Sequence, residues 1–414
     1  MRASSYNKRK IFNDPVYGFI PIEDELIFDI IEHPYFQRLR RIKQLGLTHL
    51  VYPGALHTRF HHSLGAMYLM DQIISALRLK GHKISSREKI SSSLAILLHD
   101  IGHGPFSHTL ERSILNGVHH EEISRVYMEK LNNIFSGQLD MAIQIFSGAY
   151  PKNYLHELVS SQLDVDRMDY LSRDSFFTGV SEGVINTERI IKMLTIAGNK
   201  IAVESKGIYS IEKYIIARRL MYWQVYLHKT VIAAESMLSN ILKRAKYLVR
   251  NGEKLFATPA LYEFLNNAYS ISDLREREDI LNTYSRLDDF DIFTSVKVWA
   301  EHPDIVLSSL CRGLINRHLF RTELQNDPFD PAYPDIIRQR IRKHYGINEE
   351  ESEYFFISNS TANHAYHPRS DQIHILYRSG EVIDIARASD QLNISVLHKI
   401  VTKYFACYPK HLSA

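Results

Sequence analysis

Apolar residues recur at spacings of three and four along most of the first 280 residues, and this periodicity predicts amphipathic helices. Glycine, proline and small polar residues separate the periodic stretches. The helices expected from this pattern cover residues 26–32, 36–45, 61–80, 86–100, 155–173, 211–250, 259–268, 273–287, 291–300 and 303–316. A small hairpin is expected at 201–209, with its turn at Lys206-Gly207.

The pattern changes after Arg321. Aspartate–proline pairs interrupt the chain there, and three later stretches alternate polar and apolar residues as strands do, at 354–357, 372–378 and 382–385. Ser379 and Gly380 supply the expected turn between the last two stretches. We therefore expect a mainly α fold, with a helical domain over residues 1–285 and a helical, then α+β, region over residues 286–414.

The composition is that of an ordinary soluble globular protein, with 45% hydrophobic and 23% charged residues. The 50 lysines and arginines nearly balance the 47 aspartates and glutamates, so bulk charge does not indicate a nucleic-acid or membrane-binding protein. Cys311 and Cys407 are too few for a disulfide framework or a thiolate metal site. Neither a membrane span nor a signal peptide is visible, which predicts a cytoplasmic protein.

Histidines are concentrated in one part of the chain, because nine of the 21 lie between His57 and His120. The densest segment follows an expected helix and reads HDIGHGPFSH over residues 99–108. Imidazole and carboxylate groups around one point form the mixed nitrogen and oxygen ligand set that divalent metals of intermediate softness accept. Taken alone, this segment is weak support for a metal site, since a surface histidine beside a helix-terminal charge looks the same.

Two further residues extend the metal hypothesis. His62 lies at the start of the helix expected at 61–80, and Asp166 lies on an otherwise apolar helix between Asp164 and Asp169. Three carboxylates in so short a stretch repel one another unless cations compensate their charge. A solvated acidic face is the alternative for each of them.

With these residues the chain shows the order H…HD…D and resembles the HD-domain metal-dependent phosphohydrolases, among them the deoxynucleoside triphosphate (dNTP) triphosphohydrolases. The matching segments are NDPVYG at 13–18, FQRLRRIKQLG at 36–46, FHHSLG at 60–65, HDIGHGPFSH at 99–108, HE at 120–121 and DVDRMDYLSRD at 164–174. The resemblance covers the chain from about residue 10 to residue 320 and weakens beyond. It implies that the helical domain is an HD-domain bundle.

The resemblance implies one divalent metal ion and a set of proton-transfer residues. The implied metal ligands are His62, His99, Asp100 and Asp166. The implied residues near the scissile phosphorus are His103, His108, His120 and Glu121. Two imidazoles and two carboxylates suit manganese, magnesium, iron, nickel and zinc alike, so the metal is not distinguished. His108 is expected to protonate the leaving 5′-oxygen, and a surface pair at a helix start is the alternative for His120 and Glu121.

Cations and hydroxyl groups that face the metal are expected to hold the triphosphate and the sugar. The substrate-binding residues implied by the resemblance are Arg59, Gln44, Arg167, Tyr170, Asp174, Arg218 and Tyr226. Helical spacing places Arg167, Tyr170 and Asp174 on one face. A single stripe is expected on the helix at 211–250, formed by Arg218, Tyr222, Tyr226 and Lys229. A solvated flank is the alternative for this stripe. In the family, a tyrosine under the deoxyribose leaves no room for a 2′-hydroxyl.

A regulatory nucleotide site near the NDPVYG segment is also implied, because some family members form tetramers controlled by nucleotides bound between subunits. The matching residues are Lys10, Asn13, Gln37, Arg40 and Lys229. Glu32 and Phe19 differ from the residues that the family pattern has at those positions. The alternative is structural: residues 14–18 make a turn, and residues 37–41 form an exposed basic helix face.

The leading hypothesis is a dNTP triphosphohydrolase that releases a deoxynucleoside and inorganic triphosphate. The same hypothesis expects a homo-oligomer, either a dimer or a tetramer, and allows a nucleotide effector as a further partner. One alternative is a nucleotidase or phosphodiesterase of the same fold, although three arginines exceed what a single phosphate pocket needs. Another is a nucleotide sensor or single-strand nucleic-acid-binding regulator, for which 24 tyrosines and 19 phenylalanines offer stacking surfaces. An inactive member should have lost metal ligands, and none is lost here.

Overall fold

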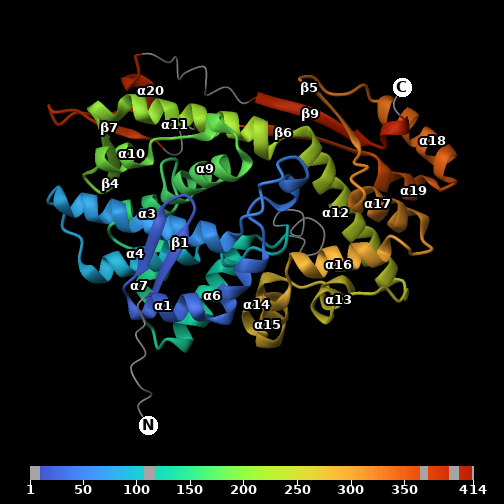
Figure 1. The fold of residues 1–414 in the computed structure, drawn as a ribbon, viewed down its shortest axis with the longest axis horizontal. Helices are drawn as coiled ribbons and strands as arrows, with labels where there is room; N and C mark the ends of the chain where they lie inside the picture. The colour runs from blue at the N-terminus through green and yellow to red at the C-terminus, as the bar shows by residue number, and fades with distance from the viewer. Residues whose placement is uncertain (1–9, 107–116, 364–371, 391–400, 413–414) are drawn as a thin grey trace, which may run out of the picture.

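Helices predominate in the computed structural model, which describes residues 10–106, 117–363, 372–390 and 401–412 (Figure 1). The first part contains β1 (Lys10–Asp14), β2 (Gly18–Ile22), α1 (Glu25–Glu32), α2 (Pro34–Gln37), α3 (Arg59–Leu79), α4 (Ser86–Leu98), α6 (His120–Ile134), α7 (Asp140–Phe146), α8 (Asn153–Val159), α9 (Val165–Thr178) and α10 (Thr187–Met193). The middle part contains β3 (Leu194–Ala197), β4 (Lys200–Glu204), α11 (Ile208–Met221), α12 (Lys229–Arg250), α13 (Pro259–Asn266), α14 (Ile271–Glu276), α15 (Glu278–Arg286), α16 (Asp289–Trp299) and α17 (Ile305–Ile315). The last part contains β5 (Arg321–Gln325), α18 (Tyr333–Tyr345), α19 (Glu349–Ser352), β6 (Ile357–Asn363), β7 (His374–Leu376), β8 (Val382–Asp384), α20 (Ile385–Ala388) and β9 (Val401–Tyr408). The expected mainly α fold with a smaller α+β part is confirmed.

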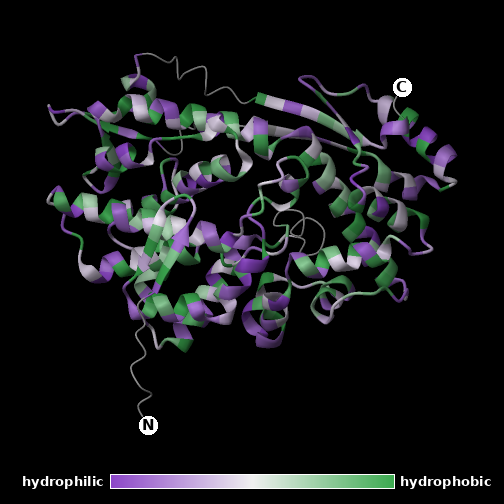
Figure 2. Cartoon of the chain, in the orientation of Figure 1, coloured by the Kyte–Doolittle hydropathy of each residue, from purple (hydrophilic) through white to green (hydrophobic). Residues whose placement is uncertain are grey.

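Helix α3 is central to the helical bundle, because it contacts both α4 and α9. Its residues Leu69, Met70, Ile73 and Leu77 are buried, and burial of each such side chain contributes roughly 1.5–3 kcal/mol. The helices in Figure 2 carry apolar and polar residues side by side, as expected of helices with one buried face. His62 lies in the first turn of this anchored helix, so the core fixes its backbone position.

Local capping explains where two helices of the bundle begin. Ser85 accepts a hydrogen bond from the amide of Glu88, and Glu88 accepts one from the amide of Ser85, which starts α4. Asp164 accepts a hydrogen bond from the amide of Arg167 and starts α9. The single helix expected at 155–173 is therefore wrong, because the chain leaves the helix after Val159 and re-enters it only at this cap.

Three other predicted helices differ from the structure. The helix expected at 36–45 ends early, since a 3₁₀ turn covers Arg38–Arg41 after the short α2. The helix expected at 211–250 is interrupted by a π-helical turn at Tyr222–Tyr226, and α12 starts afresh with His228 as its cap. The helix expected at 273–287 is split into α14 and α15 at Arg277, which adopts an extended conformation.

The strands form small sheets. The hairpin expected at 201–209 is wrong in register, because β4 pairs with the preceding β3 and residues 205–207 already turn into α11. The β7–β8 hairpin and its turn are confirmed, with Gly380 at a φ of 89°. The strand expected at 354–357 starts only at Ile357. Strand β7 pairs in parallel with β4, so the C-terminal region adds to a sheet begun by residues 194–204.

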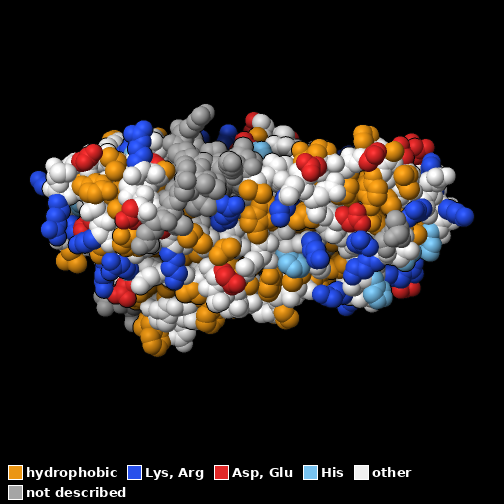
Figure 3. Space-filling model, turned by 90° about the horizontal axis from the view of Figure 1, so that it is seen from above, with side chains coloured by type: hydrophobic (Ala, Val, Ile, Leu, Met, Phe, Trp, Pro, Cys, Tyr) orange, Lys and Arg blue, Asp and Glu red, His pale blue; other side chains and the backbone are white. Residues whose placement is uncertain are grey.

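Among the described residues, no helix combines the length and the apolar character needed to cross a membrane. On the face shown in Figure 3, lysine and arginine side chains are interspersed with acidic and apolar ones. This face does not carry the continuous basic groove along which single-strand-binding proteins track the nucleic-acid backbone.

Candidate metal centre and substrate site

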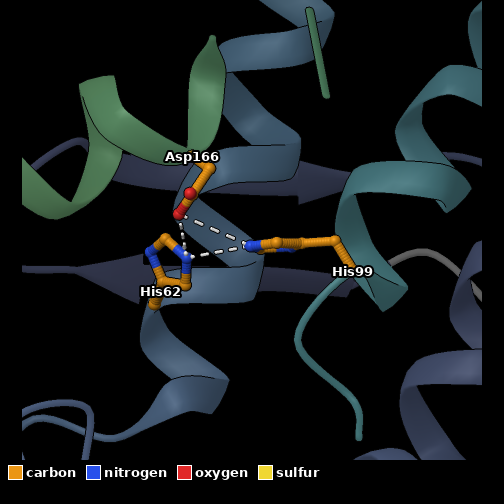
Figure 4. Close-up of side chains that lie close together, drawn as sticks. All are labelled: His62, His99 and Asp166. Atoms are coloured by element: carbon orange, nitrogen blue, oxygen red, sulfur yellow. Dashed lines mark hydrogen bonds and ion pairs between the residues drawn. The ribbon is translucent and has the colours of Figure 1, made fainter. Parts of the chain in front are cut away.

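Three of the predicted metal ligands converge from α3, the end of α4 and α9, and point toward one another (Figure 4). The Nε2 atom of His62 lies 3.4 Å from Nε2 of His99 and 3.1 Å from Oδ1 of Asp166. Nε2 of His99 lies 3.5 Å from the same carboxylate oxygen. These atoms are close enough together for one ion to contact all three.

Asp100, the fourth predicted ligand, lies beside this group. Its Oδ1 is 3.3 Å from Nε2 of His99, and its Oδ2 is 3.8 Å from Nε2 of His62. The same carboxylate forms a buried ion pair with Arg59. Burial alone would raise the pKa of Asp100, but the charges of His99 and Arg59 hold that pKa well below its usual range. Asp100 is therefore an anion at neutral pH.

The donor set fits a divalent cation. Nδ1 of His62 donates to Asp169 at 2.8 Å, and Nδ1 of His99 donates to the carbonyl of Ile96 at 2.6 Å. With a cation bound, both imidazoles would keep their proton on Nδ1 and direct the Nε2 lone pairs at the shared centre. Burial alone would lower the pKa of His62, but hydrogen bonds with Asp166 and Asp169 raise it to about 10. The centre therefore strongly favours positive charge.

A second group of possible ligand atoms, from Asp100, His103 and His120, adjoins the first. The rings of His103 and His120 stack with their centroids 3.7 Å apart, and Nε2 of His103 lies 3.4 Å from Oδ1 of Asp100. Burial and the nearby charge of Arg59 hold the pKa of His103 well below its usual value. His103 is therefore neutral at pH 7, and the same effects make it a weak base.

Of the other two predicted proton-transfer residues, the described one lies outside this group. Glu121 is exposed in the first turn of α6. His108, the residue expected to protonate the leaving oxygen, lies outside the described residues.

A buried arginine holds the turn that carries His103. Arg38 is fully buried and donates hydrogen bonds to the carbonyls of Ile101 and His103, at 2.9 and 2.8 Å. The hydroxyl of Tyr284 donates to the carbonyl of Gly102 between them, at 2.9 Å. The exposed basic face considered for residues 37–41 is therefore wrong at Arg38, which supports the site from beneath. The sequence offers no signal that separates this arginine from its exposed neighbours.

The three predicted phosphate-binding arginines each have an acidic or amide partner. Arg59 pairs with Asp100, and Arg167 pairs with Asp164, which precedes it by one turn. Burial raises the pKa of Asp164 to about 6. Arg218 donates to Oε1 of Gln162 at 3.2 Å. The buried Nε–H groups of Arg167 and Arg218 have no hydrogen-bond partner within the described part of the chain, so both guanidinium groups keep donors for a ligand.

The predicted sugar-binding residues include two tyrosines in contact. The ring of Tyr170 meets the ring of Tyr226 edge to face, with centroids 5.9 Å apart. Gln44 is half-buried, and its side-chain oxygen Oε1 is buried with no hydrogen-bond partner among residues that the structure describes. A buried acceptor without a donor costs free energy, so a ligand hydroxyl would relieve it.

Asp174 belongs to a buried network that includes a histidine not assigned from the sequence. One carboxylate oxygen lies 2.7 Å from Nε2 of His57, and the other accepts a hydrogen bond of 2.7 Å from the hydroxyl of Tyr226. The His57 ring also stacks on Phe177, 4.5 Å away. Membership of the histidine-rich segment was the only sequence signal for His57, because its partner lies 117 positions away.

The expected stripe of Arg218, Tyr222, Tyr226 and Lys229 is broken. The π-helical turn rotates the chain after α11, and the rings of Tyr222 and Tyr226 pack edge to face at 5.2 Å. Lys229 comes after the cap at His228 and is exposed at the start of α12. Single π-helical turns are frequent at functional sites, and this one presents Tyr226 to Asp174.

Four of the five residues expected at a regulatory site lie around β1 and the end of α1. Lys10 pairs with Glu32 at 2.6 Å, and the amide of Gln37 donates to a carbonyl in the last turn of α1. Arg40 donates to the side chain of Gln37 at 2.9 Å. Asn13 is exposed on β1. The fifth residue expected there, Lys229, lies at the start of α12.

Two family models and a solved structure match the chain. The HD domain matches residues 59–174, and the HD associated region matches residues 185–312. The crystal structure of a phosphohydrolase from Bacteroides thetaiotaomicron has a TM-score of 0.94 at 53% identity, covering 97% of this chain and 99% of that one. The chain belongs to the HD-domain phosphohydrolase family. All four predicted ligands of this HD phosphohydrolase lie within the HD domain.

Two relatives match the HD phosphohydrolase over different shares of its length. The Bacillus subtilis protein YwfO is 33% identical over 98% of this chain and 93% of its own length. A Dictyostelium discoideum protein, named deoxynucleoside triphosphate triphosphohydrolase SAMHD1 homolog, is 32% identical over 61% of this chain. The match covers 52% of that protein, so the HD phosphohydrolase spans about half of its length.

Proposed function

We propose that this HD phosphohydrolase converts dNTPs, with a divalent metal ion bound, to deoxynucleosides and inorganic triphosphate. The observation that carries the proposal is a set of four ligands with three arginines from α3, α9 and α11 around it. Those arginines exceed the needs of a single phosphate group. The printed name of the Dictyostelium relative supports the same substrate class.

The residues that would hold the metal are His62, His99, Asp100 and Asp166. A divalent ion held by them would polarise the α-phosphate and lower the pKa of nearby water. Asp169 and the carbonyl of Ile96 keep both imidazoles in the tautomer that binds a cation. Because Arg59 pairs with Asp100, its guanidinium lies where it can bind the phosphate oxygens beside the metal.

Arg167 and Arg218 would bind the outer phosphates. Each carries an N–H group without a partner among described residues, and both project from helices α9 and α11, which contact each other. Charge-assisted hydrogen bonds of this kind contribute more than neutral ones. A nucleoside monophosphate has a single phosphate group for three arginines, which favours a triphosphate over the nucleotidase alternative.

Proton transfer would involve the stacked histidine pair. Attack of water on the α-phosphorus breaks the bond to the 5′-oxygen, so the water must lose a proton and the leaving oxygen must gain one. His103 stacks on His120 and lies beside Asp100, so we assign the relay of a proton near the phosphorus to this pair. His108 is our choice for the donor, with Glu121 as an acid that assists His120.

The sugar would lie against Tyr170 and Tyr226, with Gln44 as acceptor for its 3′-hydroxyl. Burial and the charge of Asp174 raise the pKa of Tyr226 well above its usual value, so its hydroxyl stays protonated and bound to Asp174. The fixed ring of Tyr226 would then lie so close to the sugar that an added 2′-hydroxyl would clash with it. This arrangement supports a preference for deoxynucleotides over ribonucleotides.

A nucleotide effector and a homo-oligomer complete the proposal. The gathering of Lys10, Gln37 and Arg40 around one end of α1 supports an anion-binding surface there. Light scattering with and without GTP or a second dNTP would test it. A mass that stays that of one chain under every condition would sink this part of the proposal alone.

The activity is tested by incubating the purified protein with each of the four dNTPs and Mn²⁺ or Mg²⁺, followed by ion chromatography. The expected products are deoxynucleoside and inorganic triphosphate in equal amounts, with far less product from the matching ribonucleotides. The Asp166→Ala variant serves as the control for contaminating phosphatases. Release of pyrophosphate or orthophosphate in place of triphosphate would sink the proposal.

A further inference from the structure

A continuous chain of buried charged groups runs from the N-terminal hairpin to the candidate metal centre. On one side, Arg173 donates a hydrogen bond to Asp14 at 2.7 Å. On the other side, it donates hydrogen bonds to both carboxylate oxygens of Asp169, at 2.9 and 3.0 Å. Asp169 in turn accepts the Nδ1–H of His62 at 2.8 Å. Arg173, Asp169 and His62 are fully buried, and Asp14 is 7% exposed.

Asp14 has two tasks, one for each carboxylate oxygen. Its Oδ1 accepts the amides of Val16 and Tyr17 at 2.9 and 3.0 Å and closes the turn between β1 and β2. Its Oδ2 is left for Arg173. The hairpin turn and the arginine are therefore positioned by the same side chain, and the guanidinium also lies over the ring of Tyr17 at 5.5 Å.

Helix α3 is shaped to receive this arginine. A Cβ atom built on Gly65 would lie 2.1 Å from Nη2 of Arg173 and 2.1 Å from Oδ1 of Asp169. No side chain fits in that space, so the ion pair packs directly against the backbone of α3. Gly65 lies one turn after His62, and the contact therefore fixes Asp169 relative to the helix that carries the ligand.

We propose that Asp14 and Arg173 are positioning residues for the metal centre, a proposal that rests on the metal site of the proposed function. Arg173 holds both oxygens of Asp169, which holds the Nδ1 proton of His62 and so turns its Nε2 toward Asp166. Asp14 completes the chain, because it supplies the second anion that fixes the arginine in this orientation. The N-terminal hairpin is thus a structural part of the metal site, 48 positions before its first ligand in the sequence.

The experiment measures Mn²⁺ affinity by electron paramagnetic resonance in three asparagine variants of the full chain. Asp169→Asn should weaken Mn²⁺ binding about 10- to 100-fold, the usual effect of losing the carboxylate partner of a ligating histidine. Asp14→Asn keeps the turn acceptor but loses the charge, and we expect about a 10-fold loss, at the low end of that range. The visible absorption of bound Co²⁺ should also change in both variants.

Asp24→Asn is the matched control. Asp24 accepts two backbone amides, from Leu26 and Ile27 at 3.0 and 3.1 Å, just as Asp14 does from its turn. Asp24 caps α1 and has no arginine partner among the described residues. The Mn²⁺ affinity of the Asp24→Asn variant should therefore equal that of the natural chain. A second control, Arg244→Gln, breaks a partly buried ion pair with Asp304 and should lower the melting temperature without changing Mn²⁺ affinity.

Arg173→Lys covers the case in which Asp14→Asn does not fold. It keeps the buried positive charge but cannot span three oxygens, so it should weaken Mn²⁺ binding to a similar extent. Unchanged Mn²⁺ affinity in both Asp14→Asn and Arg173→Lys, with a loss in Asp169→Asn, would overturn the proposal and leave the metal site intact. Unchanged affinity in all three would also overturn the proposal, because Asp169 would then not orient His62 for the metal. The dNTP product assay is independent of both outcomes.

Discussion

Replacing Arg38 by methionine tests whether a buried arginine supports the catalytic turn. Methionine fills much of the same space but leaves the carbonyls of Ile101 and His103 without the donors that now lie at 2.9 and 2.8 Å. Each buried acceptor left unpaired costs about 1–3 kcal/mol. Removing the buried charge of Arg38 is itself favourable and offsets part of the cost of the two unpaired carbonyls. We expect a net loss of roughly 2–4 kcal/mol in the free energy of unfolding.

Urea unfolding followed by circular dichroism, with EDTA present so that metal binding does not contribute, measures this loss. Arg41→Met is the matched control three positions along the same 3₁₀ turn. Arg41 is exposed, and its buried partner Asp288 keeps a hydrogen bond from the amide of Phe290, so the loss of Arg41 should cost only about 1 kcal/mol. The metal-loaded Arg38→Met variant should also hydrolyse dNTPs more slowly, because the turn that orients Asp100 and His103 has loosened. Equal unfolding midpoints for the two variants would refute the reasoning.

Three further predictions concern single residues. His99→Ala and Asp166→Ala should each lose bound metal, measured by inductively coupled plasma mass spectrometry, together with all hydrolysis, and activity without metal would contradict the ligand assignment. Arg218→Ala should keep the metal but raise KM for dNTPs about 10-fold or more, as expected for one lost charge-assisted hydrogen bond, so an unchanged KM would count against a triphosphate role. Burial alone would raise the pKa of Glu88, but hydrogen bonds from Lys152, Ser85 and Tyr150 lower it to about 2 from 4.5. The ionised Glu88 side chain therefore contributes its full stabilisation above pH 4.5 and loses it as the pH falls through 2. Urea melts at a series of pH values should show the stability difference between Glu88→Gln and the natural chain vanishing over that window.

The candidate metal ligands could be chosen from the sequence because local pattern carries them. His62 and Asp166 each lie in the first turn of a helix, and His99 and Asp100 directly follow one, so short segments already hold their relative positions. The predicted mainly α fold follows from the same periodicity. The family resemblance indicated, in addition, which of the several histidines belong to one site.

The parts that sequence could not provide depend on contacts between distant positions. The pairing of His57 with Asp174 and of Arg173 with Asp14 joins residues 117 and 159 positions apart, and no spacing rule reaches that far. The burial of Arg38 is decided by the tertiary turn that packs over it. The interruption after Met221 was missed because helical periodicity continues through a π-helical turn, which adds one residue without changing the residue types.

The most direct test of the central claim is hydrolysis of a dNTP in ¹⁸O-labelled water with Mn²⁺ bound, followed by mass spectrometry of both products. Attack of water on the α-phosphorus predicts one ¹⁸O atom in the inorganic triphosphate and none in the deoxynucleoside. Label in a monophosphate, in pyrophosphate or in the deoxynucleoside would contradict the account.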